Sequence, residues 1–348
     1  MFEGAALLSA LAGDPELEAF FTDAADLAAM LRVEAALATA EAEAGLIAPG
    51  TAARIAATCA DFQPDWSALR LGLARDGVVV PELVRQLRSA VGEPHAQDLH
   101  RGATSQDIVD TSLVLRLAPA LASLDGRLDA LHTASTGLSA RVGAQPLMAQ
   151  TRMQRALPFT VADKLETWRG PIARHRARLS ELRPRLLKLQ LGGPVGTRAE
   201  LGTEAEAIAA AMAKRLGLSD APAWHTQRDT IAELGAWLAL VAGSLGKIGQ
   251  DVALMVQNEV GTARLAGGGT SSAMAHKSNP VSAELLVSLA RFTAGLSGTL
   301  TTAVVHENER SGAAWTLEWL VLPQLVVSTG AALRIALGLL DTLSFPSP

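Results

Sequence analysis

The sequence predicts an all-α protein in which long helices pack side by side as a bundle. Two observations carry this prediction. Apolar residues recur with helical spacing over long segments, and the apolar/polar alternation typical of strands is nearly missing. Hydrophobic residues also make up 49% of the 348 residues and charged residues only 19%. We therefore expect other subunits to cover part of the apolar surface.

Three segments carry apolar residues at alternating steps of three and four, which places them on one face of a helix. They are Ile231, Leu234, Leu238, Val241, Leu245, Ile248, Val252 and Met255; Leu165, Trp168, Ile172, His175, Leu179, Leu182, Leu186 and Leu189; and Leu117, Leu121, Leu124, Leu128 and Leu131. Pro119, Pro171 and Pro184 lie inside these patterns and are predicted to kink or break the helices. His175 is expected to be a core histidine with a hydrogen-bond partner.

The first part of the chain has shorter predicted helices than the rest. Glycine and proline punctuate it at Gly13-Asp14-Pro15, Pro49-Gly50 and Gly92-Glu93-Pro94. We predict a small N-terminal helical domain over 1–103 and a central long-helix bundle domain over 104–348.

Composition disfavours several classes of partner. The most apolar stretch, Trp319 to Leu340, contains a proline, a glutamine, a serine and an arginine, whereas a membrane-spanning helix needs about 20 mostly apolar residues. The first residues lack the basic flank of a signal peptide. A net charge of −5 gives no attraction for nucleic acid, and Cys59, the single cysteine, allows no internal disulfide and no cysteine-based metal site. We expect a cytoplasmic protein with no membrane or nucleic-acid partner.

A first polar segment runs from His100 to Asp107. A threonine and a serine, Thr104 and Ser105, followed by Asp107 are typical of a helix start. The neighbouring His100 and Arg101 would add positive charge to the free N–H groups of that helix end, which suits a bound carboxylate. An ordinary N-cap would produce the same pattern, so this segment alone does not decide between the two.

A second segment, Thr151 to Pro158, contains Arg152 and Gln154 and suits the opening of a helix at Pro158. Considered alone, it could equally be a solvated face.

The third segment is the most specific. It runs from Gly269 to Pro280 and holds two serines, a lysine and an asparagine just before a predicted helix, so it could close over a bound anion. The alternative is a surface loop, which the two accompanying segments disfavour.

Together these segments resemble the signatures of the fumarase/aspartase superfamily. The third is similar to Gly-Ser-Ser-x-Met-Pro-x-Lys-x-Asn-Pro, the first to His-x-Gly-x-Thr-Ser-x-Asp and the second to Thr-His-x-Gln-x-Ala-x-Pro. They occur in the superfamily's order, so the resemblance spans most of the chain. Residues 224–229 and 306–319 further resemble the carboxymuconate cycloisomerase branch.

The resemblance implies a mostly helical homotetramer whose central domains form one bundle and whose active sites combine segments of different subunits. It implies an isomerase that closes a lactone ring on a small tricarboxylate, 3-carboxy-cis,cis-muconate, in the degradation of protocatechuate. Neither a metal nor an organic cofactor is expected.

The resemblance also implies roles for individual residues. Ser271 corresponds to the catalytic acid/base, Lys277 to a stabiliser of the intermediate, and Glu284 to the carboxylate that pairs with the second segment's histidine. His100 is expected to hydrogen-bond substrate, and its acid/base role stays open. The residues expected to bind substrate are Arg101, Thr104, Ser105, Arg152, Gln154, Ser272, Met274, Asn279 and Arg310.

The sequence departs from the superfamily pattern at three positions. Thr270 replaces a glycine, Ala275 replaces a proline, and Arg152 stands where the lyases carry histidine. The chain also ends at Pro348, soon after the last predicted bundle helix, so we expect the small C-terminal helical domain of many relatives to be absent.

The presence of Arg152 at the position where the lyases carry histidine favours lactonisation over elimination. Elimination of an amine or water benefits from a second acid/base residue. In lactonisation the nucleophile is the substrate's own carboxylate, which is already ionised at neutral pH. A permanent cation that binds carboxylates is then the more useful group.

Two alternatives remain open. One is a lyase of the adenylosuccinate or argininosuccinate type, which should be impaired without the histidine. The other is a non-catalytic helical scaffold, which would need neither Ser271, Lys277 nor Asn279.

Overall fold

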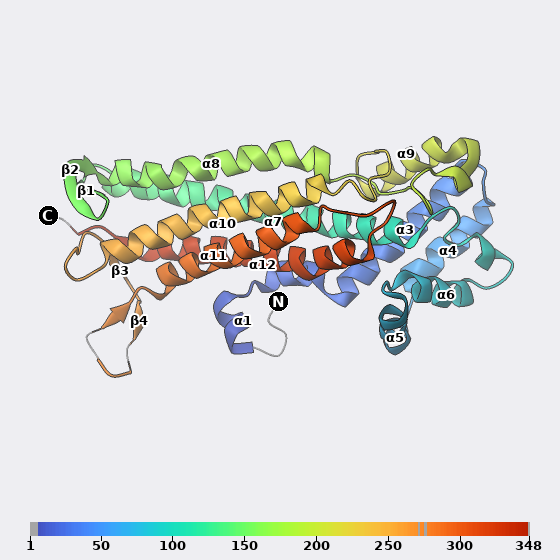
Figure 1. The fold of residues 1–348 in the computed structure, drawn as a ribbon, viewed down its shortest axis with the longest axis horizontal. Coiled ribbons are helices and arrows are strands. Elements are labelled where there is room, and N and C mark those ends of the chain that lie inside the picture. Colours follow the sequence, from blue (N-terminus) through green and yellow to red (C-terminus); the bar gives the residue numbers. More distant parts are fainter. Residues whose placement is uncertain (1–5, 271, 275–276, 347–348) are drawn as a thin grey trace.

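The chain forms an elongated bundle of long helices with a compact group of shorter helices at one end (Figure 1). The structure is a computed structural model and describes residues 6–270, 272–274 and 277–346. Over these residues it contains twelve α-helices and only short strands. The predicted all-α class is therefore confirmed.

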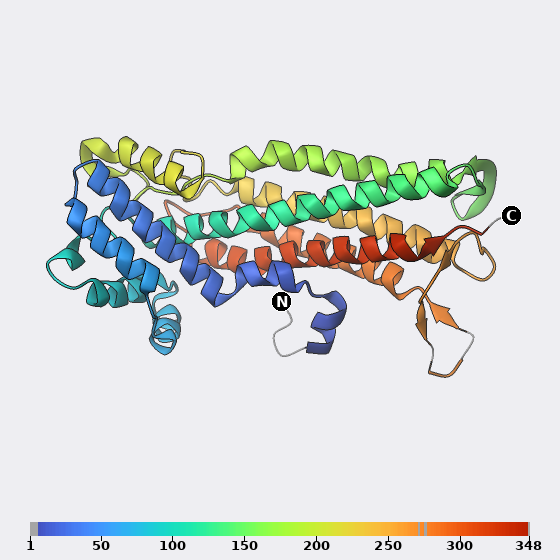
Figure 2. The same ribbon diagram turned by 180° about the vertical axis from the view of Figure 1, so that it is seen from behind.

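The bundle consists of five long helices that run along the molecule. These are α7 (Ser105–Val142), α8 (Val161–Leu186), α10 (Asp229–Met255), α11 (Val281–Thr302) and α12 (Gly312–Thr342). The compact end is built from α3 (Asp23–Glu43), α4 (Pro49–Asp61), α5 (Trp66–Asp76), α6 (Val80–Val91) and α9 (Ala205–Leu216). Two short helices near the N-terminus, α1 (Ala6–Ala12) and α2 (Pro15–Glu18), lie beside the bundle (Figure 2).

Three antiparallel strand pairs and three 3-10 helices complete the chain. The pairs are β1 (Pro146–Thr151) with β2 (Gln154–Thr160), β3 (Arg264–Leu265) with β6 (Leu343–Ser344), and β4 (Gly269–Thr270) with β5 (Ser278–Asn279). The 3-10 helices are Ala19–Phe21, His95–Asp98 and Ala199–Glu204.

The predicted apolar seams form the core of the bundle. Every seam residue of α10 is buried, and so are those of α7 and α8. Leu189, the last residue of the second predicted seam, is also buried, but it follows the end of α8 and packs in the core of the compact end. His175 is buried among them, and its Nε2 lies 2.8 Å from the Ser244 hydroxyl. Burial, with Arg178 and Arg174 nearby, lowers the pKa of His175 to about 4, so the ring is neutral at pH 7. The prediction of a hydrogen-bonded core histidine is confirmed.

The prolines do not interrupt these helices. Pro119 lies inside α7, and Pro171 and Pro184 lie inside α8, each of which continues past them. The helices therefore do not break at these prolines, and a kink there stays a prediction. Each proline lies off the buried seam, and the seam residues on both sides remain packed, so tertiary burial outweighs the loss of a backbone hydrogen bond.

The compact end has a second apolar core, formed by α3, α4, α6, α9 and the first turns of α7. It includes residues between Leu189 and Leu216, which follow α8 in sequence and pack against the N-terminal helices. A domain boundary at 103/104 stays a prediction.

Two of the bundle helices, α10 and α12, are long and apolar enough to pass a test for membrane spans. In this structure 56% of the most apolar stretch of α10 and 72% of that of α12 is buried inside the protein. Packing against neighbouring helices accounts for their apolar composition.

Truncation of a seam residue should destabilise the protein. Leu238 is fully buried in the core of the bundle, so Leu238→Ala should lower the free energy of unfolding by about 3 kcal/mol through lost burial and a residual cavity. Leu71 is 72% exposed on α5, and Leu71→Ala should change it by less than about 0.5 kcal/mol. Urea unfolding followed by circular dichroism measures both, and equal losses would contradict the packing described.

Candidate active site

A buried carboxylate, Asp107, organises the start of α7. It is fully buried, and a carboxylate in that position must be satisfied by hydrogen-bond donors. Its oxygens accept bonds of 2.8–2.9 Å from the backbone N–H groups of Thr104, Gly192 and Gly193 and from the side chains of Gln190 and His225. The predicted helix start is confirmed, and the helix end that carries Thr104 and Ser105 is held from several directions.

His100 lies just before this helix in a left-handed backbone conformation, with φ of 62°. Gly102 follows with φ of 64°, and a Cβ there would collide with the side chain of Leu201, so only glycine fits. The Nδ1 atom of His100 lies 2.7 Å from Oε1 of Glu34, a fully buried carboxylate on α3. This contact leaves Nε2 of the ring for a ligand.

The charge state of His100 follows from its surroundings. Burial disfavours the charged ring, but the Glu34 carboxylate outweighs burial, and the pKa of His100 is raised above its usual value. Glu41 lies two turns further along α3 and is also buried, and neither of its oxygens has a hydrogen-bond partner among the described residues. Burial raises the pKa of Glu41 to about 8, so it is mostly protonated at pH 7.

Two predicted arginines lie at the same end of the molecule. Arg101 turns toward the N-terminal helices, where its Nη1 lies 3.4 Å from both Asp98 Oδ1 and the Leu46 carbonyl. Arg310 donates from Nε to Gln106 at 3.1 Å and from Nη2 to the Pro194 carbonyl at 3.0 Å.

A buried ionic cluster that the sequence analysis did not identify supports this end. Arg228 is fully buried between Asp110 on α7 and Glu318 on α12, and its Nη1 lies 2.6 Å from Asp110. The indole of Trp315 donates to the same aspartate at 3.0 Å. The cluster joins α7 to α12 and to the turn before α10, and so fixes the surroundings of the first segment.

The second segment lies at the opposite end and is a hairpin. Strands β1 and β2 pair around a turn formed by Arg152 and Met153, with φ of 48° and 65°. Positive φ at both central residues is the signature of a tight two-residue hairpin turn. Arg152 is exposed at the tip and forms no ion pair with any described residue, and Gln154 is exposed beside it.

The expected helix opening at Pro158 is therefore wrong. Helix α8 begins at Val161, after a capping box in which Asp163 Oδ2 accepts from the Thr160 N–H at 2.9 Å. The Thr160 hydroxyl accepts from the Asp163 N–H in return, at 3.2 Å. This box satisfies two N–H groups at the helix start, whereas Pro158 lies in strand β2.

The third segment forms a second projecting hairpin at the same end of the bundle (Figure 1). Gly268 approaches the other strand so closely that a Cβ would lie 2.1 Å from the Ser278 hydroxyl oxygen. Ser272, Met274 and Lys277 are exposed and Asn279 is half-buried. Helix α11 follows directly, as predicted, with Glu284 exposed in its first turn. Ser271 lies outside the described residues, as does Ala275.

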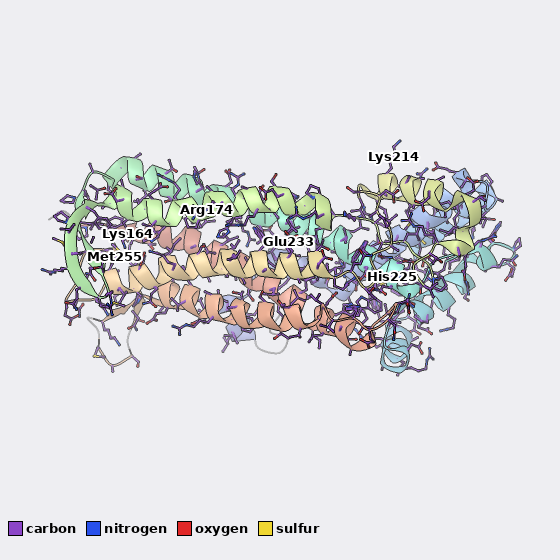
Figure 3. The ribbon with its side chains drawn as sticks, turned by 45° about the horizontal axis from the view of Figure 1, so that its top comes forward. Lys164, Arg174, Lys214, His225, Glu233 and Met255 are labelled. Carbon is purple, nitrogen blue, oxygen red and sulfur yellow. The ribbon has the colours of Figure 1, made fainter. Side chains whose placement is uncertain are left out.

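The segments lie at the two ends of a long molecule. Helix α7 has 38 residues, so about 57 Å separates its start beside His100 from the hairpin that follows its end. Figure 3 shows the same separation, with His225 near one end of the bundle and Met255, the last residue of α10, at the other. One chain therefore cannot bring His100 or Thr104 into one pocket with Arg152 or Lys277.

The sequence analysis missed the side chains that orient the first segment. Glu34 is 66 positions from His100, and a buried glutamate on an alanine-rich helix gives no local sign of its partner. The pairs of His225 with Asp107 and of Arg228 with Asp110 also join residues that are far apart in the chain.

Comparison with known proteins yields close relatives. The chain is 44% identical over 335 residues to 3-carboxy-cis,cis-muconate cycloisomerase of Pseudomonas aeruginosa, covering 94% of this chain and 73% of that protein. It is 41% identical over 330 residues to the enzyme of the same name from Pseudomonas putida, covering 92% and 78%. The crystal structure of 3-carboxy-cis,cis-muconate lactonizing enzyme from Pseudomonas putida matches with a TM-score of 0.92 and 40% identity, over 98% of this chain and 77% of that one.

The family match agrees with these relatives. Residues 12–295, most of the chain, match the Lyase family. With the order of the three signature segments and the helical bundle, the match identifies the chain as a member of the Lyase family within the fumarase/aspartase superfamily.

Proposed function

We propose that this chain converts 3-carboxy-cis,cis-muconate to 4-carboxymuconolactone by intramolecular addition of a carboxylate to a double bond. The observation that carries the proposal is the exposed Arg152 at a hairpin tip, in the place of the lyases' histidine, in a chain 44% identical to a cycloisomerase of that substrate. Enzymes of this family act on small carboxylates and are typically oligomeric. We further infer a cytoplasmic homotetramer.

The chemistry suits the groups available. One substrate carboxylate forms the new C–O bond, and the electron pair of the attacked double bond moves to the carbon beside another carboxylate. Enforced proximity accelerates the attack, and cationic or hydrogen-bonding groups stabilise the electron-rich intermediate. A proton donor then completes the lactone, so no atom is gained or lost overall apart from that proton.

Each segment would supply one part of this chemistry. Arg152 and Lys277 would bind substrate carboxylates as exposed cations, with Asn279 as a hydrogen-bond donor. Ser271 would deliver the proton to the intermediate. His100 would bind a carboxylate through Nε2, because Glu34 holds its other nitrogen.

The separation of the segments supports a site shared between subunits. The first hairpin exposes apolar as well as cationic groups, since Met153 is 72% and Leu157 73% exposed. Exposed apolar side chains on a projecting element favour contact with a neighbouring subunit. In a tetramer, the hairpins of one subunit would lie against the compact end of another.

A lyase reaction such as adenylosuccinate cleavage is the second candidate. It is favoured by the retained serine, lysine and asparagine of the third segment and disfavoured by Arg152. Ultraviolet assays with 3-carboxy-cis,cis-muconate and with adenylosuccinate distinguish the two, because the proposed reaction removes the diene absorbance of the former.

Ser271→Ala should lower kcat by about 10³-fold while leaving KM nearly unchanged, because it removes the proton donor and no carboxylate-binding group. Ser282→Ala, on the exposed first turn of α11, is the matched control and should retain wild-type turnover. Steady-state loss of diene absorbance measures both variants. Near-normal turnover in Ser271→Ala would remove this residue from the mechanism.

Subunit mixing tests whether the site is shared. His100→Asn and Lys277→Ala should each be nearly inactive, yet a co-assembled 1:1 mixture should regain about a quarter of wild-type activity, because some sites receive both intact segments. Mixing Ser271→Ala with Lys277→Ala is the control. Both changes lie in one segment, so no site becomes intact. A mixture of the first pair that stays inactive would contradict a shared site.

Glu34→Gln tests how the charge of His100 is maintained. Loss of the carboxylate should lower the pKa of His100, so the ring should lose its charge at a lower pH than in the parent protein. We expect KM to rise about tenfold at pH 7, with a smaller change at lower pH and little change in kcat.

Glu41→Gln is the control for that experiment. Glu41 is mostly protonated at pH 7, because burial raises its pKa to about 8, so a neutral amide of the same shape should alter the pH profile little there. A Glu34→Gln profile of KM that superimposes on that of the parent protein would exclude the proposed role of Glu34.

A further inference from the structure

Gln106, the second residue of α7, is a fully buried amide with a partner for each of its polar groups. Its Nε2 donates to the His225 carbonyl at 2.8 Å and to Oδ2 of Asp110 at 3.1 Å. Its Oε1 accepts from Nε of Arg310 at 3.1 Å. One buried side chain of α7 therefore connects the turn before α10 to the segment before α12.

Only one orientation of this amide fits its neighbours. Asp110 Oδ2 and the His225 carbonyl accept hydrogen bonds, whereas the guanidinium of Arg310 can only donate them. Turning the amide by half a turn would direct its N–H groups at the guanidinium and its oxygen at two other oxygens. Because buried polar groups without partners are costly, the oxygen of Gln106 is directed at Arg310.

The carboxylate of Asp110 holds the amide in place from the other side. Its two oxygens accept from Arg228 at 2.6 and 3.1 Å, and Nε1 of Trp315 donates to it at 3.0 Å. All three of these side chains are buried. A packed ionic cluster therefore sets the position of the Gln106 oxygen, and with it the direction of the Nε–H group of Arg310.

Arg310 is held without being neutralised. Its two hydrogen-bond acceptors, the Gln106 amide oxygen and the Pro194 carbonyl, are both uncharged. Arg310 is exposed, and in the part of the chain that the structure describes it has no ion pair and its other N–H groups have no partner. Arg228, in contrast, is fully buried between two carboxylates. Arg310 therefore keeps N–H donors and a positive charge for a carboxylate ligand.

Arg310 also lies beside the first segment. Its Nη2 donates to the Pro194 carbonyl at 3.0 Å. The preceding Gly193 packs so closely on Gly102 that a Cβ there would lie 2.9 Å from the Gly102 carbonyl oxygen. Gly102 is two residues after His100 in the chain. The loop of Gly193 and Pro194 thus joins Arg310 to the end of the molecule that carries His100.

We propose that Gln106 is a positioning residue, which holds Arg310 beside the start of α7 as a cation free to bind one carboxylate of the substrate. The inference rests on the proposed function for the identity of that substrate. An amide suits this task better than a carboxylate, because a glutamate in its place would form an ion pair with Arg310 and weaken its attraction for the ligand.

A double-mutant cycle tests whether Gln106 acts through Arg310. Gln106→Met keeps the length of the side chain and removes the amide, so KM should rise about tenfold with little change in kcat, as in Arg310→Met. The variant with both changes should have a KM within about twofold of that of Arg310→Met, because the positioned group is already gone. Increases that multiply in the double variant would show a purely structural role for Gln106 and overturn the proposal.

Arg310→Lys separates position from charge. Lysine keeps the positive charge but lacks the Nε–H group that Gln106 binds, so KM should stay at least about fivefold above that of the parent protein. A KM equal to that of the parent would overturn the proposal, and this variant decides the question if circular dichroism shows that Gln106→Met does not fold. Ser112→Ala is the matched control. It removes another buried hydrogen bond of α7, to Asp26, and should change KM by less than about twofold.

A crystal structure of Gln106→Met gives a readout that does not depend on the reaction. The guanidinium of Arg310 should be displaced by about 1 Å or more, while Arg228 stays paired with Asp110. An Arg310 that keeps its place would overturn the proposal. If the parent protein cleaves adenylosuccinate and leaves 3-carboxy-cis,cis-muconate unchanged, the proposed function fails, whereas the same KM ratios measured with adenylosuccinate still decide the role of Gln106.

Discussion

Burial of the apolar seams of α7, α8 and α10 is the constraint on which the rest of this structure depends. Leucine, isoleucine and valine at steps of three and four compel the helices to lie side by side over their whole length. The product is a rod, and the connections between its five long helices lie toward its ends (Figure 1). The described residues with proposed chemistry therefore lie at one end or the other, and a site that combined both ends would have to draw them from different chains.

The regular parts of the fold could be predicted from periodicity, whereas the irregular parts could not. The seam of α10 was predicted residue by residue because one repeated spacing determines its buried face. The hairpin around Arg152 was missed because its turn lacks the glycine or asparagine that usually marks positive φ. Glu34 was missed because its contact with His100 arises only when α3 packs against the start of α7.

Three buried acidic residues in the compact end differ in what compensates their negative charge. Asp107 accepts hydrogen bonds from several donors, Glu34 pairs with His100, and Glu41, whose oxygens have no hydrogen-bond partner among the described residues, is mostly protonated at pH 7. The result is a limited negative potential beside the helix end that would receive an anionic substrate. Electrostatic compensation inside this end would therefore favour the binding of an anionic substrate there, beside the cations on the hairpins.

The backbone conformation of the hairpin formed by β1 and β2, like the separation of the three segments, favours a contact between this hairpin and another subunit. Arg152 and Met153 both adopt positive φ without being glycine, which costs of order 1 kcal/mol each. Such strain persists where surrounding contacts over-determine it, yet Met153 is 72% exposed within its own chain. Contacts from another subunit would supply the packing that this strained turn lacks within its own chain. They would bury Met153 and hold the guanidinium of Arg152 over a neighbour's site.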